Sequence, residues 1–250
     1  MKKITPAAIL RARALEALKA TWPIVLAGSA LFNLASYVLN QALGMIPVLG
    51  AYLGFLVTAL LMVPMMGLTK GVLGYYRGKP LTLDSMKAMF PHWQKVCMLY
   101  LWEMLYMMGW IALGMLPMLI GSVMMVSETM GALGILLMLA GLVLMLVLAF
   151  RAALDYSMAN CILIDDPSTR ARDALKKSKA MIHGYRWYDV KVNFPVFIIL
   201  FAAIFVIGAL TAALPVWLAS LISSVMAIFT SVFSYYFLPV MYEELKRIGR

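Results

Sequence analysis

The chain has 250 residues, of which 64% are apolar and only 13% are charged, and its mean hydropathy is +0.91. A soluble domain keeps about a quarter of its residues charged, so this composition excludes a soluble protein and indicates an integral membrane protein. The net charge of +10 would suggest nucleic-acid binding in a soluble protein. Here membrane topology accounts for that charge, and we expect no nucleic-acid partner.

The apolar residues form six segments that are long enough to cross a bilayer core of about 30 Å. The short connections within the three pairs contain no Lys or Arg, whereas the flanking segments hold 20 of the 21 basic residues. Under the positive-inside rule this asymmetry predicts an all-α, polytopic bundle of three hairpins with both termini cytoplasmic. The predicted spans are Trp22–Gly44, Val48–Lys70, Val96–Val126, Gly131–Ile164, Asn193–Ala213 and Val216–Pro239.

A short basic segment precedes each hairpin and ends at a tryptophan, which is Trp22, Trp93 or Trp187. Tryptophan favours the headgroup level, so we expect these three residues to be interfacial anchors. We predict a cytoplasmic interfacial amphipathic helix before each hairpin; the third has an apolar arc that includes Ala174, Leu175 and Ile182. Selective lipid recognition and simple anchoring both remain open for these helices. The candidates for contact with lipid headgroups are Arg11, Arg172, Lys176 and Lys179.

Prolines recur at similar distances behind these tryptophans. Pro47, Pro117 and Pro215 follow Trp22, Trp93 and Trp187 by 25, 24 and 28 residues. We interpret residues 1–250 as one integral-membrane domain built from three copies of one unit, with repeats at 4–77, 78–165 and 166–247. The alternative is that basic, tryptophan-ended junctions recur because topology alone selects them.

Residues 156–187 read YSMANCILIDDPSTRARDALKKSKAMIHGYRW, and an alanine- and leucine-rich run precedes Trp22. With these features the chain resembles the bacterial integral-membrane family known as domain of unknown function 975. The resemblance implies a six-helix protein of the bacterial cytoplasmic membrane and no defined activity. A weaker resemblance is to the membrane domains that accompany some glycerophosphodiester phosphodiesterases.

Three charged residues fall inside the middle hairpin, and they are Glu103, Arg151 and Asp155. If helices three and four pair about their turn, the two carboxylates sit at one depth, and Arg151 and Asp155 share a helix face at i,i+4. Charges in a bilayer pair with one another, so we expect a cluster. The favoured interpretation is a structural clasp between the two helices; the alternative is a proton or cation site, or a pocket for a basic group.

The sequence contains no arrangement typical of a catalytic triad, a phosphate loop or a metal site. We therefore expect no cofactor and no metal, and enzymatic activity is the weaker hypothesis. The leading hypothesis is a non-enzymatic membrane module that binds a lipid, a hydrophobic peptide or a membrane partner. The alternative is a small ion-coupled transporter or exporter that uses the Glu103, Arg151 and Asp155 cluster.

Overall fold

The computed structural model describes residues 4–46, 49–127, 130–211 and 214–249, and these ranges contain helices and no strand. The all-α prediction is therefore confirmed. Pro47, Val48 and Ala213, which belong to predicted turns and spans, lie outside the described residues. The helices are α1 (Ala7–Gly44), α2 (Leu49–Tyr76), the 3₁₀ helix η1 (Leu83–His92), α3 (Trp93–Met124), α4 (Gly131–Tyr156), α5 (Ala159–Asp165), α6 (Ala171–Ile182), α7 (Arg186–Thr211) and α8 (Val216–Gly249).

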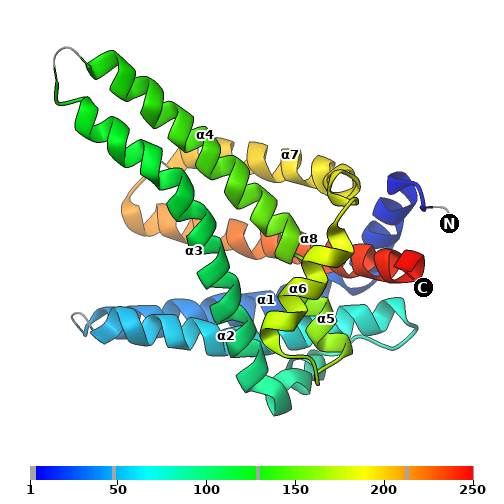
Figure 1. The fold of residues 1–250 in the computed structure, drawn as a ribbon. Coiled ribbons are helices and arrows are strands. Elements are labelled where there is room, and N and C mark those ends of the chain that lie inside the picture. The colour runs from blue at the N-terminus through cyan, green and yellow to red at the C-terminus, as the bar shows by residue number, and fades with distance from the viewer. Residues whose placement is uncertain (1–3, 47–48, 128–129, 212–213, 250) are drawn as a thin grey trace.

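The long helices pair as hairpins, α1 with α2, α3 with α4 and α7 with α8, and the C-terminal ends of α1, α3 and α7 lie on the same side of the molecule (Figure 1). The short helices α5, α6 and η1 lie at the opposite end. Four helical segments among the described residues are long and apolar enough to cross a membrane, as expected for an integral membrane protein. These segments are Ala7–Leu43, Leu53–Tyr76, Leu83–Met124 and Gly131–Asp165.

The three predicted interfacial helices have three different structures. The first is not a separate element, because α1 continues through Pro23 without a break; neighbouring groups in a bundle often compensate the backbone bond that such a proline removes. The second is the 3₁₀ helix η1, which leads directly into α3 at Trp93. The third is a separate helix, α6, and the chain reverses into α7 at Gly184, whose φ of +86° suits glycine.

The amphipathic pattern of α6 is confirmed, but its apolar face is covered by protein. Ala174, Leu175, Ser178 and Ile182 are all buried, and α6 packs on α3, α4 and α5. The predicted span Gly131–Ile164 is also interrupted, since α4 ends at Tyr156 and α5 begins at Ala159. The hydroxyl of Ser178 compensates this break by donating to the Asp155 carbonyl at 2.7 Å and accepting from the Met158 N–H at 3.1 Å.

Glycines bring α3 and α4 into close contact. A Cβ on Gly121 would lie 2.6 Å from the carbonyl oxygen of Gly134, and a Cβ on Gly134 would lie 2.7 Å from that of Gly121. A Cβ on Gly114 would meet the backbone of Met145, and one on Gly141 would meet Met118. Small residues are the usual means of close helix packing in membranes, where no water drives association.

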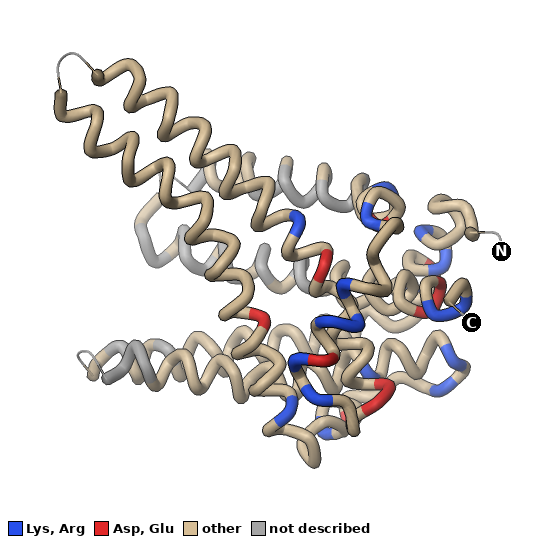
Figure 2. Tube along the Cα trace, viewed as in Figure 1, with Lys and Arg blue, Asp and Glu red and all other residues tan. Residues whose placement is uncertain are grey.

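Charged residues gather at one end of the bundle, and the hairpin tips at the other end carry none among the described residues (Figure 2). We call this region the charged end; it comprises the start of α1, the end of α2, η1, α5, α6, the start of α7 and the end of α8. It contains much of the buried core, including Tyr236 and Met241. The outer half of the α3–α4 hairpin exposes large apolar side chains such as Leu116 and Leu136.

Candidate functional site

Asp165, at the end of α5, is the centre of the charged end. Its carboxylate accepts from Arg77 Nη1 at 2.6 Å, from Tyr242 Oη at 2.8 Å, and from Lys246 Nζ. Arg77 also reaches Glu243 at 2.5 Å. These contacts tie the ends of α2 and α8 to α5, so one carboxylate that is only 12% exposed joins parts of all three predicted repeats.

A second cluster of charged contacts fastens the N-terminal arm to α8. The Thr5 N–H donates to Glu244 Oε1 at 2.9 Å, and Arg247 reaches the same oxygen at 2.6 Å. Burial alone would raise the pKa of Glu244, but the hydrogen bonds from Arg247 and Thr5 lower it to about 2. The Tyr188 hydroxyl of α7 donates to the Thr5 carbonyl. The start of the chain is thus fixed against the third hairpin.

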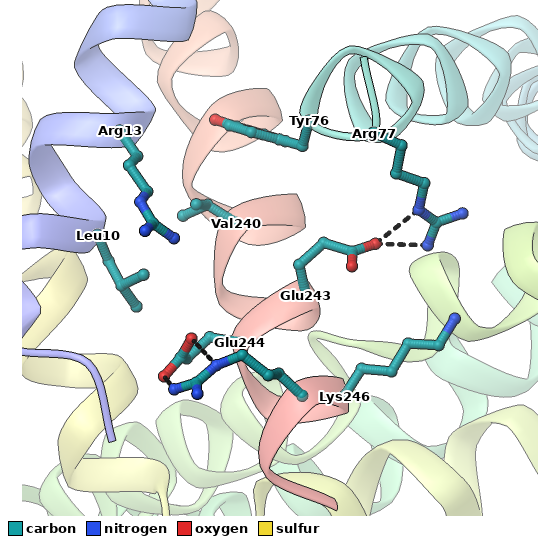
Figure 3. A pocket seen from close by; sticks show the side chains of 9 residues that line it. Leu10, Arg13, Tyr76, Arg77, Val240, Glu243, Glu244 and Lys246 are labelled. Atoms are coloured by element: carbon teal, nitrogen blue, oxygen red, sulfur yellow. Dashed lines mark hydrogen bonds and ion pairs between the residues drawn. The ribbon is translucent and has the colours of Figure 1, made fainter. Parts of the chain in front are cut away.

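Between these two clusters lies a cavity of about 810 Å³, open on one side, which we call the arginine cavity. α1, the end of α2 and α8 form its walls (Figure 3). Figure 3 shows Arg13 extending from α1 into the space, across from the Arg77–Glu243 pair. The apolar part of the lining includes Leu10 and Val240. The site therefore combines charged groups with a hydrophobic wall.

Arg13 differs from the other basic residues of this lining. Arg77, Lys246 and Arg247 each form an ion pair with a carboxylate, whereas Arg13 has no ion pair or hydrogen bond with any described residue. The arginine cavity has four basic and two acidic residues in its lining. A second cavity of about 610 Å³ shares Arg13 and Tyr76 with the first and adds one basic and one acidic residue, Lys79 and Glu16. An unpaired guanidinium between two open cavities is suited to binding an anion.

The structure does not assemble the predicted cluster of Glu103, Arg151 and Asp155. Asp155 is 3% exposed and forms its ion pair with Arg186 of α7 at 2.6 Å. Arg151 is exposed and has no described ion pair. Glu103 lies in a separate small cavity with residues of α2, α5 and α8. The expected pairing of Asp155 within the middle hairpin is therefore wrong. Its buried carboxylate forms an ion pair with Arg186, which belongs to the third hairpin.

The predicted anchors and headgroup contacts lie on the surface. Trp22, Trp93 and Trp187 are 49%, 46% and 77% exposed. Lys176 and Lys179 are exposed as well. Arg172 instead lies over the Trp102 ring at 5.5 Å and donates to the Tyr106 hydroxyl at 3.2 Å, and Arg11 donates from Nε to the Ala7 carbonyl of its own helix.

Sequence reasoning selected Arg11 and missed Arg13 and Asp165. A usable signal for Arg13 was its spacing, since Leu10, Arg13 and Ala17 lie on one helix face at i,i+3 and i,i+7 and all three line one or other of the two cavities. Nothing in the sequence distinguished Asp165 from its neighbour Asp166, which accepts from Ser168 and Thr169 in a local turn. Comparison of the chain with family models, curated proteins and solved structures gave no match.

Proposed function

We propose that the chain is a non-enzymatic, six-span protein of the bacterial cytoplasmic membrane, with both termini cytoplasmic, that binds the phosphate headgroup of an anionic lipid in the arginine cavity. The membrane placement is supported by the four spanning helices and by the location of the charged residues at one end. The three repeats and the resemblance to the domain of unknown function 975 remain part of this proposal.

Arg13 is the observation that carries the proposal. Its guanidinium extends into an open cavity and forms no ion pair with a described carboxylate, and a phosphate ester offers the oxygen geometry that a guanidinium prefers. The acyl chains would stay in the bilayer, because Leu10 and Val240, the apolar residues of the lining, are only 1% and 4% exposed. Of the ligands considered from the sequence, an anionic lipid fits this combination best, and it would lie where the charged end meets the membrane surface.

The test is native mass spectrometry of the full chain in mild detergent with phosphatidylglycerol. We expect one retained lipid per chain, and Arg13→Gln should weaken retention about fivefold, because one basic contact at the surface contributes about 1 kcal/mol. Lys19→Gln is the control, since it removes one positive charge from the same helix at an exposed residue that lines neither cavity. Equal retention by both variants would refute the proposed site.

Two additional measurements by the same method identify the ligand. Phosphatidylcholine should be retained less than phosphatidylglycerol if net negative charge is recognised. Soluble glycerol 3-phosphate distinguishes a lipid from a free phosphate ester: displacement of the lipid by it would mean that the headgroup alone is the ligand.

The alternative function, a small ion-coupled transporter or exporter, was motivated by a shared site of Glu103, Arg151 and Asp155. Asp155 is paired with Arg186, so this hypothesis keeps only Glu103 as a candidate coupling residue. Ion flux in liposomes with Glu103→Gln would test it.

A further inference from the structure

A cavity of about 130 Å³ lies where the three hairpins meet, and we call it the Glu103 cavity. α2 contributes Met62, Met65, Met66 and Thr69 to its lining, α3 contributes Val96, Tyr100 and Glu103, α5 contributes Asn160, and α8 contributes Tyr235. It is separate from the arginine cavity, with which it shares no lining residue. Inferences about the two sites can therefore be tested independently.

Glu103 lies well inside the apolar part of α3. It is ten residues beyond Trp93, which is about 15 Å along a helix at about 1.5 Å per residue. An ionised carboxylate at such depth is costly unless a proton or another positive charge accompanies it. No described Lys, Arg or His forms an ion pair with Glu103, and no described residue is hydrogen-bonded to it.

Asn160 and Tyr100 are the other polar side chains of this cavity that have no described hydrogen bond. The two remaining hydroxyl groups of the lining are bonded to protein: Thr69 donates to the Met65 carbonyl at 3.1 Å, and Tyr235 donates to Met65 Sδ at 2.8 Å. The cavity thus offers three groups without a described partner, the Glu103 carboxylate, the Asn160 amide and the Tyr100 hydroxyl. Each has an oxygen that can accept a hydrogen bond and the carboxylate can carry a negative charge, so the ligand should be a positively charged hydrogen-bond donor.

Size and lining decide between kinds of cation. The cavity volume of about 130 Å³ exceeds the volume of a bare alkali ion. It is about the volume that four water molecules occupy in the liquid, at about 30 Å³ each. Methionine thioethers, Val96 and aromatic side chains form the rest of the wall, so it suits carbon better than a water shell. A soft metal ion would bind the thioethers, but Met65 already accepts from Tyr235, and a carboxylate is a hard ligand.

We infer that the Glu103 cavity binds a protonated primary amine, either a small alkylamine or the ammonium end of a larger molecule. Its N–H groups would donate to the Glu103 carboxylate and the Asn160 amide oxygen. Its carbon atoms would contact Met62, Met66 and Val96. The bound ammonium supplies the positive charge that the carboxylate lacks, and the three hairpins around the cavity would be held together more firmly when it is occupied.

Equilibrium binding of radiolabelled propylammonium to the full chain in detergent micelles tests the inference. We expect saturable binding of one ligand per chain. Glu103→Gln should weaken it about 100-fold, as expected when one partner of a buried, hydrogen-bonded charge pair is removed. Asn160→Ala should weaken it about tenfold, because one hydrogen bond to a charged group is lost. Unchanged affinity in Glu103→Gln would overturn the inference.

Matched controls separate binding from general effects on folding. Asn33→Ala removes an amide that donates to the Ser29 carbonyl within α1, and it should leave affinity unchanged. If Glu103→Gln does not fold, competition against the unaltered protein still decides the question. Ethylammonium should displace the label, and the neutral analogue propan-1-ol should not. If sodium or silver ions displace the labelled propylammonium and ethylammonium at the same concentration does not, the site binds a metal ion and the inference is overturned.

The source of the amine is identified by repeating the assay in nanodiscs. If phosphatidylethanolamine nanodiscs block the label and phosphatidylcholine nanodiscs do not, the natural ligand is a lipid ammonium group. If neither blocks it, the ligand is a free amine. Loss of phosphatidylglycerol retention in Arg13→Gln would not affect either result, because the two cavities have no common residue.

Discussion

The two ends of the bundle are held together by different interactions. At the charged end, Asp165 and Asp155 connect hairpins to one another through ion pairs with Arg77, Lys246 and Arg186. Glu244 of α8 accepts a hydrogen bond from the Thr5 N–H of the N-terminal arm. Toward the tips, the α3–α4 hairpin relies on glycine contacts within itself and exposes its outer apolar surface. Charged contacts can specify which hairpins meet, because each requires a particular partner, whereas small residues only allow two helices to approach.

The largest loss of stability should follow from removing the carboxylate of Asp165 at the charged end. Asp165→Asn leaves the Arg77 and Lys246 charges without their shared carboxylate. Removing one member of a buried ion pair typically costs about 3 kcal/mol; Asp165 is 12% exposed, but Arg77 and Lys246 are 37% and 30% exposed, so this value is an upper bound. We expect the midpoint of an SDS unfolding titration to fall accordingly, together with loosened contacts between α2 and α8 that crosslinking would detect. An unchanged midpoint would mean that the connection between hairpins depends on apolar packing alone.

The next largest loss of stability should come from disrupting the glycine contacts between α3 and α4. Gly114→Leu drives a side chain into the backbone of Met145, and overpacking of this kind costs about 2 kcal/mol. Gly109→Leu is the matched control in the same helix, because a Cβ at Gly109 meets nothing within 4 Å. We expect Gly114→Leu to lower the unfolding midpoint and separate α3 from α4 while the charged end stays intact. If both variants behave alike, close packing is not what holds the hairpin together.

Sequence reasoning predicted what depends on composition and periodicity. The all-α fold and the two-faced pattern of α6 are confirmed, since both follow from residue spacing alone. The partner of Asp155 could not be predicted in this way. Arg151 lies four residues away on the same helix, but Arg186 belongs to the next hairpin and reaches the carboxylate only once the hairpins have packed.

The glycine contacts, in contrast, left a signal that could have been used. Gly114 and Gly121 are seven residues apart in α3, as are Gly134 and Gly141 in α4, so each pair lies on one helix face. This spacing in two consecutive helices predicts close packing. The interruption at Ser157 and Met158 had no comparable signal, because the Ser178 hydroxyl that stabilises it comes from another helix.

A smaller effect with a defined pH dependence is expected at Asp189, in the first turn of α7 and four residues before the predicted span. Burial raises its pKa to about 6, although the Asn193 side chain opposes this by donating to it. The folded state therefore binds the proton more tightly than the unfolded state. The wild-type protein loses stability as pH rises from the unfolded pKa of about 4 through 6.

Asp189→Asn removes that loss and keeps an oxygen that can accept from Asn193. We expect it to raise the unfolding midpoint at pH 8, where the ionised carboxylate destabilises the wild-type protein, and to have little effect at pH 4. Comparing variant with wild type at each pH cancels the contribution of other groups, such as Glu244. A variant that is destabilised at pH 8 would indicate that the ionised carboxylate has an undescribed partner.

The smallest effect is expected from an ion pair that does not connect hairpins. Asp84 and Lys87 lie 2.8 Å apart within η1, and their side chains are 81% and 79% exposed. Exposed pairs of this kind contribute little, because water and salt screen them. Asp84→Asn should leave the unfolding midpoint unchanged within error, at low and high salt alike.

Asp84→Asn removes the same charge from the same end of the molecule as Asp165→Asn, so the difference in unfolding midpoint between the two variants measures what burial and shared partners contribute. A loss comparable to that of Asp165→Asn would mean that the net charge of this end, rather than its specific pairs, stabilises the bundle.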